Sequence, residues 1–261
     1  MTAPEPPIAQ AASATQCAPV AIVAARGSDQ ERSASQFDST GWEGENIAEL
    51  LAATEARHPG SVAPTPIIAV DYPAAMGLPN ASQGELSLAF FAPLMPDPVG
   101  AILQRFTDSV ESGRATAAAQ IAAFEKSTGC HPTYVFIGYS QGAVVLAPLA
   151  TDYAADGRLA GAIFFGNPLQ RRGDDATVGA RHGESAAIDL LGAHHADTLR
   201  SLDSSLRLNY CLEGDPICNF TPQNAITEFG NGLATHTSYF LTPRPEDDIV
   251  ADRLHGFLTG D

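Results

Sequence analysis

The segment YVFIGYSQGAVVLAPLA, residues 134–150, constrains the fold more than any other part of the chain. It begins with the bulky and β-branched residues of a buried strand and ends with an apolar run typical of a helix. Between the two, Gly-Tyr-Ser-Gln-Gly places Ser140 between Gly138 and Gly142. A G-x-S-x-G pattern between a strand and a helix is typical of a sharp turn that lifts a nucleophilic serine above a sheet. An ordinary tight turn is the alternative, because the short pattern alone is not specific.

A nucleophilic serine needs a base to take its proton and an acid to orient that base. In hydrolases with such a turn, the chain order is serine, then aspartate or glutamate, then histidine. Asp215 stands out among the acids after Ser140, because it follows an expected strand and lies between Cys211 and Cys218. The alternative for Asp215 is an ordinary turn residue in its Gly-Asp-Pro sequence.

Only two histidines, His236 and His255, follow Asp215. His255 falls in the last turn of an expected helix, where a cation suits the helix dipole, so it has a structural explanation. His236 lies in GLATHTSYF without such a role, and elimination selects it as the base. The pair at 194–195 precedes Asp215, and we interpret these histidines, His194 and His195, as solvated loop residues rather than metal ligands.

Apolar runs of strand length alternate with longer helical patterns along the whole chain. The expected strands are 20–28, 66–73, 133–139, 159–168 and 205–218. The expected helices are 41–60, 101–127 (as one helix, or as two broken near Gly113), 142–155 and 244–260. In residues 101–127, Ile102, Leu103, Phe106, Ile121 and Phe124 are expected to face inward. This alternation predicts an α/β fold with a mostly parallel sheet covered on both faces.

No break in composition divides the chain, so we expect one domain over residues 17–261 after a flexible segment at 1–16. Segments 74–98 and 167–205 do not fit the alternation and are expected as long loops. The first sixteen residues lack the basic and apolar regions of a signal peptide and look like the start of a mature secreted protein.

The charge balance excludes some classes of partner. The chain has 14 basic and 30 acidic residues, a formal charge of −16. This disfavours nucleic acid, whose binding depends on Lys and Arg, and also electrostatic docking on anionic lipid. The apolar runs are shorter than the roughly 18 residues that a membrane span needs, so no integral membrane segment is expected.

Four cysteines allow three pairings. Their spacing fits no zinc pattern, because neither C-x-x-C nor histidines at i and i+4 occur. We favour bridges Cys211–Cys218 and Cys17–Cys130, and therefore an oxidising compartment. The alternative is a cytosolic protein with free, buried cysteines.

The ordered motifs ARGS, GYSQG, CLEGDPIC and HTSY resemble the cutinase family of secreted serine esterases. VDYPA at 70–74 is similar to its actinobacterial branch, including mycobacterial cutinase-like proteins. The resemblance runs from about Cys17 to the C-terminus and implies a small three-layer α/β-hydrolase with a five-stranded parallel sheet and no metal or other cofactor. It implies the same two disulfides, a triad of Ser140, Asp215 and His236, and an oxyanion hole from the Gln141 N–H with the N–H and hydroxyl of Ser28.

The chain departs from the pattern of fungal cutinases in its spacing. Ser140 and Asp215 lie 75 positions apart, and Asp215 and His236 lie 21 apart. The extra length falls in 167–205 and 219–235, with another apparent insertion in 74–98, so an open, lidless site is not carried over. The apolar run LAFFAPLMP at 88–96 predicts either a helix on the core or the lining of an acyl groove or lid.

The expected function is that of a secreted serine esterase or lipase that cleaves carboxylic esters, either acyl lipids or polyester-type substrates. We expect a monomer, in the medium or the cell envelope, that acts at lipid or polymer surfaces. An acyltransferase, a thioesterase or a phospholipase A would use the same triad. A catalytically silent envelope protein that keeps the scaffold is the alternative from a different class.

Overall fold

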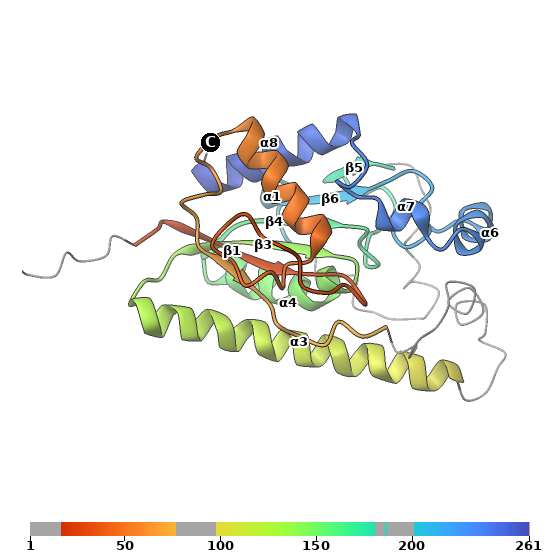
Figure 1. The fold of residues 1–261 in the computed structure, drawn as a ribbon, viewed down its shortest axis with the longest axis horizontal. Coiled ribbons are helices and arrows are strands. Elements are labelled where there is room, and N and C mark those ends of the chain that lie inside the picture. The colour runs from red at the N-terminus through yellow and green to blue at the C-terminus, as the bar shows by residue number, and fades with distance from the viewer. Residues whose placement is uncertain (1–16, 77–97, 181–185, 187–200, 261) are drawn as a thin grey trace, which may run out of the picture.

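The computed structural model describes residues 17–76, 98–180, 186 and 201–260. Within these residues, six parallel strands form one sheet in the order β2-β1-β3-β4-β6-β5 (Figure 1). The strands are β1 (Val20–Ala25), β2 (Ile67–Ala69), β3 (Thr133–Tyr139), β4 (Leu159–Phe165), β5 (Thr177–Gly179) and β6 (Arg207–Cys211). The helices are α1 (Glu45–Arg57), α3 (Pro98–Thr128), α4 (Gln141–Ala155), the 3-10 turn η3 (Ser204–Leu206), α6 (Pro222–Gly230), α7 (Ala234–Thr237) and α8 (Pro245–Thr259).

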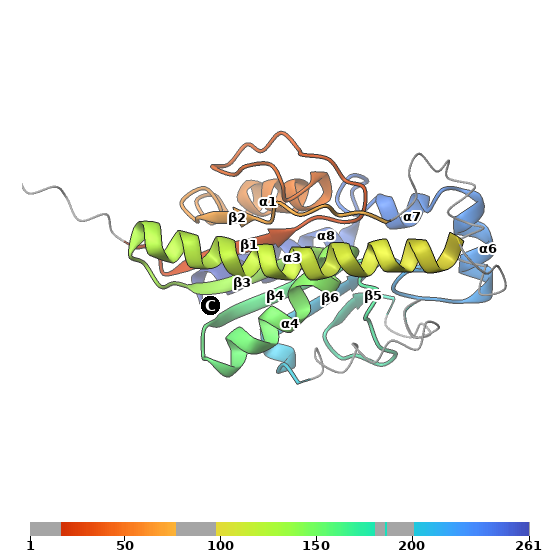
Figure 2. The same ribbon diagram turned by 90° about the horizontal axis from the view of Figure 1, so that it is seen from below.

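Helices cover both faces of the sheet, as the alternation in the sequence predicts. In β1, Ala21 and Val23 pack into the core that α3 and α4 cover, while Ile22 and Ala24 pack into the core under α1 and α8. Successive side chains of a strand point to opposite faces, and a parallel sheet buries both, so the strand is apolar throughout. Figure 1 shows α1 and α8 above the sheet, and Figure 2, which views the molecule from below, shows α3 and α4 in front of it. The fold is therefore a three-layer α/β fold.

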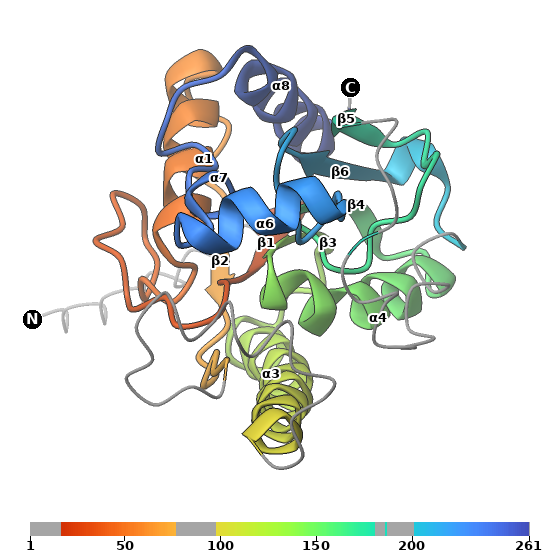
Figure 3. The same cartoon turned by 90° about the vertical axis from the view of Figure 1, so that its right-hand side faces the viewer.

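The order of the strands determines where a site can form. From β1 the chain runs to β2 on one side and then returns to β3 on the other side of β1. The loops after β1 and β3 therefore leave the same edge of the sheet and diverge, which creates a crevice at the carboxyl ends of these strands. Figure 3 views the molecule from this edge, with α6 and α7 in front of the strands.

The expected number of five strands is too low by one, because the described residues form six. The sixth strand, β5, has three residues, lies inside the expected loop 167–205, and pairs with β6 at the edge of the sheet. A run this short carries no periodicity, so only its pairing partner reveals it.

Residues 98–128 form one continuous helix, α3, and not two helices broken near Gly113. A Cβ at Gly113 would lie 2.9 Å from side-chain atoms of Tyr72 and Val145, so this glycine allows close packing of α3 rather than ending it. Leu103 is 40% exposed, which contradicts its expected inward position, whereas Ile121 is buried.

Both expected disulfides are present. Cys17 and Cys130 join the segment before β1 to the loop before β3, and Cys211 and Cys218 enclose the loop after β6. Segment 1–16 lies outside the described residues. So do residues 77–97 of the expected loop 74–98, which include the apolar run 88–96, and residues 181–185 and 187–200 of the expected loop 167–205. None of the described helices combines the length and the hydropathy that crossing a bilayer requires.

Candidate active site

Ser140 stands on a strained turn between β3 and α4. Its φ and ψ of 51° and −117° are rare for a residue with a side chain, at a cost of about 1–3 kcal/mol. The flanking glycines make the turn possible. A Cβ at Gly138 would lie 2.7 Å from the backbone of α4, and one at Gly142 would lie 1.9 Å from the carbonyl oxygen of Ala25. Any larger residue at either position would push α4 away from the sheet.

The structure brings together the three residues that the sequence singled out. His236 Nε2 lies 3.0 Å from Ser140 Oγ, and His236 Nδ1 lies 2.8 Å from Asp215 Oδ2. The exposed fractions of Ser140 and His236 are 6% each, and Asp215 is fully buried. A proton can therefore pass from the hydroxyl to the imidazole while the carboxylate holds the ring on its other side.

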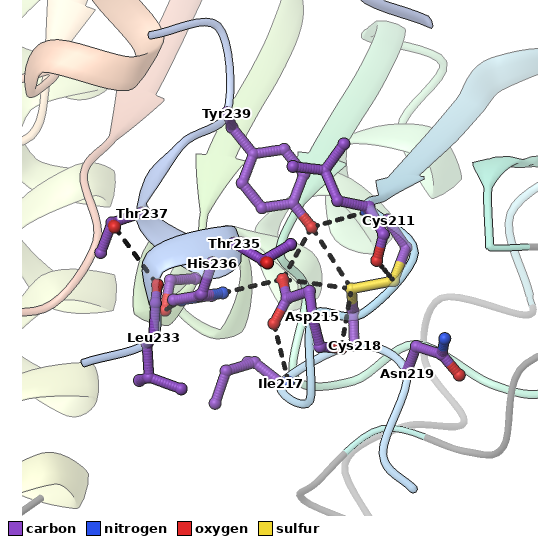
Figure 4. A network of polar contacts seen from close by, with 12 residues as sticks. Cys211, Asp215, Ile217, Cys218, Asn219, Leu233, Thr235, His236, Thr237 and Tyr239 are labelled. Carbon is purple, nitrogen blue, oxygen red and sulfur yellow. Dashed lines mark hydrogen bonds and ion pairs between the residues drawn. A yellow bond between two sulfur atoms is a disulfide. The ribbon is translucent and has the colours of Figure 1, made fainter. Parts of the chain in front are cut away.

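The loop that carries Asp215 is held by covalent and polar contacts (Figure 4). The Cys211–Cys218 disulfide closes it, and the Asp215 N–H donates to the carbonyl oxygen of Leu212 at 3.1 Å. The N–H of Ile217 donates to Asp215 Oδ1 at 2.8 Å. Together, these contacts hold the carboxylate in one orientation toward the histidine.

Tyr239 makes a contact that the sequence did not predict. Its hydroxyl lies 2.7 Å from Asp215 Oδ2, the same oxygen that contacts His236 (Figure 4). Tyr239 belongs to the HTSY segment, in which only the histidine received a role from the sequence. The sequence does show a tyrosine three residues after His236, but it does not show which way the tyrosine ring points.

His236 lies in the short helix α7 and contacts several elements. The Tyr139 hydroxyl donates to the His236 carbonyl oxygen at 2.8 Å, and the two rings stack with centroids 5.3 Å apart. A Cβ at Gly166, whose φ is +54°, would lie 2.7 Å from His236 Cε1. The Glu228 carboxylate accepts the N–H and the hydroxyl of Thr235 at 2.7 and 2.8 Å, which ties α7 to α6.

The loop after β1 brings the expected oxyanion donors to the same crevice. A Cβ at Gly27 would lie 3.2 Å from the Cβ of Ser140, so the backbone next to Ser28 runs directly beside the nucleophile candidate. Ser28 Oγ is buried and has no hydrogen-bond partner among the described residues. Gln141 is the first residue of α4, so its N–H has no partner within the helix.

Arg26 holds the loop after β1 in place through hydrogen bonds to backbone carbonyl oxygens. Its guanidinium donates to the carbonyl oxygens of Gln30 at 2.7 Å, Val70 at 3.3 Å and Tyr72 at 2.5 Å. It also lies 4.5 Å from the centroid of the Trp42 ring. Burial lowers the pKa of Arg26 from its ordinary value, but a guanidinium remains charged at every pH at which a protein is folded.

A chain of side-chain amides connects the loop after β1 to the histidine loop. Gln30 Oε1 accepts the N–H of Gly27 at 2.8 Å, and Gln30 Nε2 donates to Asn46 Oδ1 at 2.6 Å. Asn46 Nδ2 in turn donates to the carbonyl oxygens of Thr237 at 3.1 Å and Tyr239 at 2.7 Å. The backbone on both sides of the crevice is therefore joined through two side chains.

The remaining histidine candidates do not reach the site or cannot be placed. His255 stacks on His58 with ring centroids 4.0 Å apart and hydrogen-bonds Ser61 Oγ, so it lies between α8 and the end of α1. His194 and His195 lie outside the described residues. Across the part of the chain that the structure describes, no group of three His, Cys, Asp or Glu residues is placed to hold a metal ion.

Solved structures bear on the fold of this chain, and a family model bears on its family. Among solved structures, a novel cutinase-like protein from Cryptococcus sp. shares the fold, with a TM-score of 0.55 and 18% identity over 95% of this chain and 97% of that chain. Trichoderma reesei cutinase in complex with a C11Y4 phosphonate inhibitor matches with a TM-score of 0.42 and 17% identity, over 86% of this chain and 76% of that chain. No curated protein matches the chain. The family model of cutinases matches residues 16–243, and the chain therefore belongs to the cutinase family.

Proposed function

We propose that this chain is a secreted serine esterase or lipase that hydrolyses carboxylic esters through an acyl-enzyme. One observation carries the proposal: two hydrogen bonds, of 3.0 and 2.8 Å, join Ser140 to His236 and His236 to Asp215 at the crevice beside β1. Membership of the cutinase family supports ester hydrolysis as the activity.

In the first half of the reaction, Ser140 Oγ attacks the carbonyl carbon of the ester as its proton moves to His236 Nε2. The carbonyl π electrons move to oxygen, and the resulting oxyanion accepts hydrogen bonds from the Gln141 N–H and from the N–H and hydroxyl of Ser28. The tetrahedral intermediate then expels the alcohol oxygen, which takes the proton from His236. Asp215 stabilises the imidazolium between these two proton transfers.

In the second half, water attacks the acyl carbon while His236 takes one of its protons. The second tetrahedral intermediate breaks its bond to Ser140 Oγ, and the proton on His236 returns to this oxygen. The carboxylic acid leaves, and the enzyme is restored. No cofactor is needed in either half.

Acyl lipids and polyester-type materials are the proposed substrate classes, acted on at their surfaces by a monomer outside the cytoplasm. The two disulfides are compatible with an extracellular or envelope location, where such bonds persist. A chain-length series of p-nitrophenyl esters distinguishes a lipase from a short-chain esterase. Addition of alcohol acceptors to the same assay reveals transfer, because an acyltransferase would form the new ester in preference to the acid.

A fluorophosphonate probe tests the proposal directly, since it forms a covalent bond only with an activated serine. We expect labelling of the oxidised wild-type protein and none of Ser140→Ala, together with loss of p-nitrophenyl butyrate hydrolysis in the variant. Ser61→Ala is a matched control, because Ser61 Oγ also hydrogen-bonds a histidine, His255, but Ser61 follows α1 and contacts α8. Wild-type protein that is folded, oxidised and unlabelled would favour a silent scaffold and overturn the proposal.

A further inference from the structure

The hydroxyl of Tyr239 and the imidazole of His236 meet on one carboxylate oxygen. Their distances from Asp215 Oδ2 are 2.7 and 2.8 Å, and both Asp215 and Tyr239 are fully buried (Figure 4). The other oxygen, Asp215 Oδ1, accepts the N–H of Ile217. The negative charge that faces the imidazole is therefore shared among three donors, with no water needed to satisfy it.

The surroundings of Tyr239 determine the direction in which its O–H points. The N–H of Leu212 donates to the phenol oxygen at 2.9 Å, so the phenol proton cannot point that way. Cys218 Sγ lies 3.4 Å from the hydroxyl, but it belongs to a disulfide and is a weak acceptor without a proton of its own. Asp215 Oδ2 is the strong acceptor that remains, and the phenol donates to it.

Tyr239 keeps this proton at neutral pH and below. Burial raises the pKa of Tyr239 well above its ordinary value, and the nearby charge of Asp215 raises it further. A group whose pKa is raised in this way remains a neutral donor at neutral pH and below. The phenol is therefore a donor to Asp215 Oδ2 throughout the acidic range.

Among the described residues, few other titratable groups face the histidine. Those that contact its ring, its backbone or a neighbouring residue are Asp215, Tyr239, Tyr139 and Glu228. Tyr139 stacks on the ring, but its hydroxyl donates to the His236 carbonyl oxygen and not to the carboxylate. The Glu228 carboxylate is occupied by Thr235. Tyr139 and Tyr239 thus both place a phenol beside His236, and of the two only Tyr239 hydrogen-bonds Asp215.

We propose that Tyr239 is a positioning residue that acts on His236 through Asp215. This role rests on the proposed esterase function. By donating to Oδ2, the phenol holds the carboxylate in place and draws off part of its negative charge. Without the phenol, more of that charge acts on the imidazole, which stabilises its protonated form and makes the base available only at higher pH.

The test compares two equal deletions, Tyr239→Phe and Tyr139→Phe, each of which removes one buried phenol oxygen beside His236. The readout is kcat/KM for p-nitrophenyl butyrate against pH, whose acidic limb reports the free enzyme's base. In Tyr239→Phe we expect this limb to move to higher pH by about half a unit or more, as loss of a charged hydrogen bond implies. In Tyr139→Phe we expect a lower kcat/KM, with the acidic limb at the same pH as in the wild-type protein.

The possible outcomes distinguish a failure of this inference from a failure of the proposed function. If the parent hydrolyses the ester but both variants keep its acidic limb, or both shift equally, Tyr239 has no specific role. If the parent neither hydrolyses the ester nor reacts with the fluorophosphonate, it is the proposed function that fails. Should Tyr239→Phe not fold, 3-fluorotyrosine at position 239 keeps the ring and strengthens the donor. With it, we expect the acidic limb to move to lower pH, and an unmoved limb contradicts the inference.

Discussion

The loop that carries Asp215 and the loop that carries Ser28 are held in place in different ways. The acid loop, residues 211–218, is closed by a disulfide, and every oxygen of its buried carboxylate has a donor. The oxyanion loop, residues 26–30, is held by side-chain hydrogen bonds, while Ser28 Oγ lacks a partner among the described residues. A carboxylate that orients a base must keep its contacts throughout the reaction. A donor for an oxyanion must instead stay unpaired until the substrate supplies the charge.

The loops are nevertheless not independent. Gln30 and Asn46 connect the N–H of Gly27 to the carbonyl oxygens on the C-terminal side of His236. A displacement of the histidine loop would therefore be transmitted to the backbone beside Ser28. Effective catalysis needs the base and the oxyanion donors in a fixed mutual geometry, because small misplacements cost large factors in rate.

The largest effect is expected from Asp215→Asn in the acid loop. The amide can no longer stabilise the imidazolium, and it favours the wrong ring tautomer, so kcat should fall by a factor on the order of 10⁴. Steady-state kinetics with p-nitrophenyl butyrate measure the loss. Asp252→Asn is the control, since this half-exposed carboxylate contacts Arg57 and His58 instead. A loss below tenfold would mean that another group orients the histidine.

Ser28→Ala should lower kcat by a factor on the order of 10² without changing the melting temperature. Removal of one oxyanion donor has this magnitude. The hydroxyl has no partner to lose among the described residues, so folding should be unaffected. Ser33→Ala, in the same loop region, removes a hydroxyl that contacts the Gly41 carbonyl oxygen and should leave kcat unchanged. If the melting temperature fell by as much as the loss of a buried hydrogen bond causes, the result would contradict the inference that Ser28 Oγ is unpaired.

Asn46→Ala tests whether the loops are coupled. It leaves two carbonyl oxygens and the Gln30 amide without this partner, which should cost about 1–3 kcal/mol of unfolding free energy and about tenfold in kcat. Chemical denaturation and steady-state kinetics measure the two losses. Thr54→Val is the matched control on α1, because Thr54 is equally buried but its hydroxyl hydrogen-bonds the Leu50 carbonyl oxygen within the same helix. Lost stability with parental kcat would show that the connection is structural alone.

The smallest effect on kcat is expected from the disulfide variants, which also separate an effect on activity from an effect on stability. The double variant Cys211→Ser/Cys218→Ser should lose several-fold in kcat and fewer degrees of melting temperature than the variant that lacks the other bridge. Cys17→Ser/Cys130→Ser should show the reverse, because this bridge lies at the far ends of β1 and β3. Loop entropy over separations of 7 and 113 residues gives about 2.5 and about 4.8 kcal/mol, respectively. Unchanged activity in the first variant would show that hydrogen bonds alone hold Asp215.

Local sequence was sufficient for the features that depend on neighbours in the chain. The strand, the two glycines and the apolar helix around Ser140 predict the turn, and they do so because periodicity and backbone sterics are local. The sixth strand was missed, since β5 is defined by pairing with β6 rather than by a pattern of its own. The sequence left open whether residues 101–127 form one helix or two broken near Gly113, for a related reason: this glycine allows contact with α4, and a helix pattern does not show which elements pack against it.

By itself, the sequence determined the order of layers, the turn at Ser140 and a short list from which elimination drew Asp215 and His236. Only the tertiary structure decided that the Tyr239 hydroxyl meets Asp215, and that Asn46 reaches carbonyl oxygens 191 and 193 positions away. The physical reason is the range of the interactions. Helix and strand patterns repeat over a few residues, whereas a hydrogen bond between distant segments depends on where the whole sheet places their backbones.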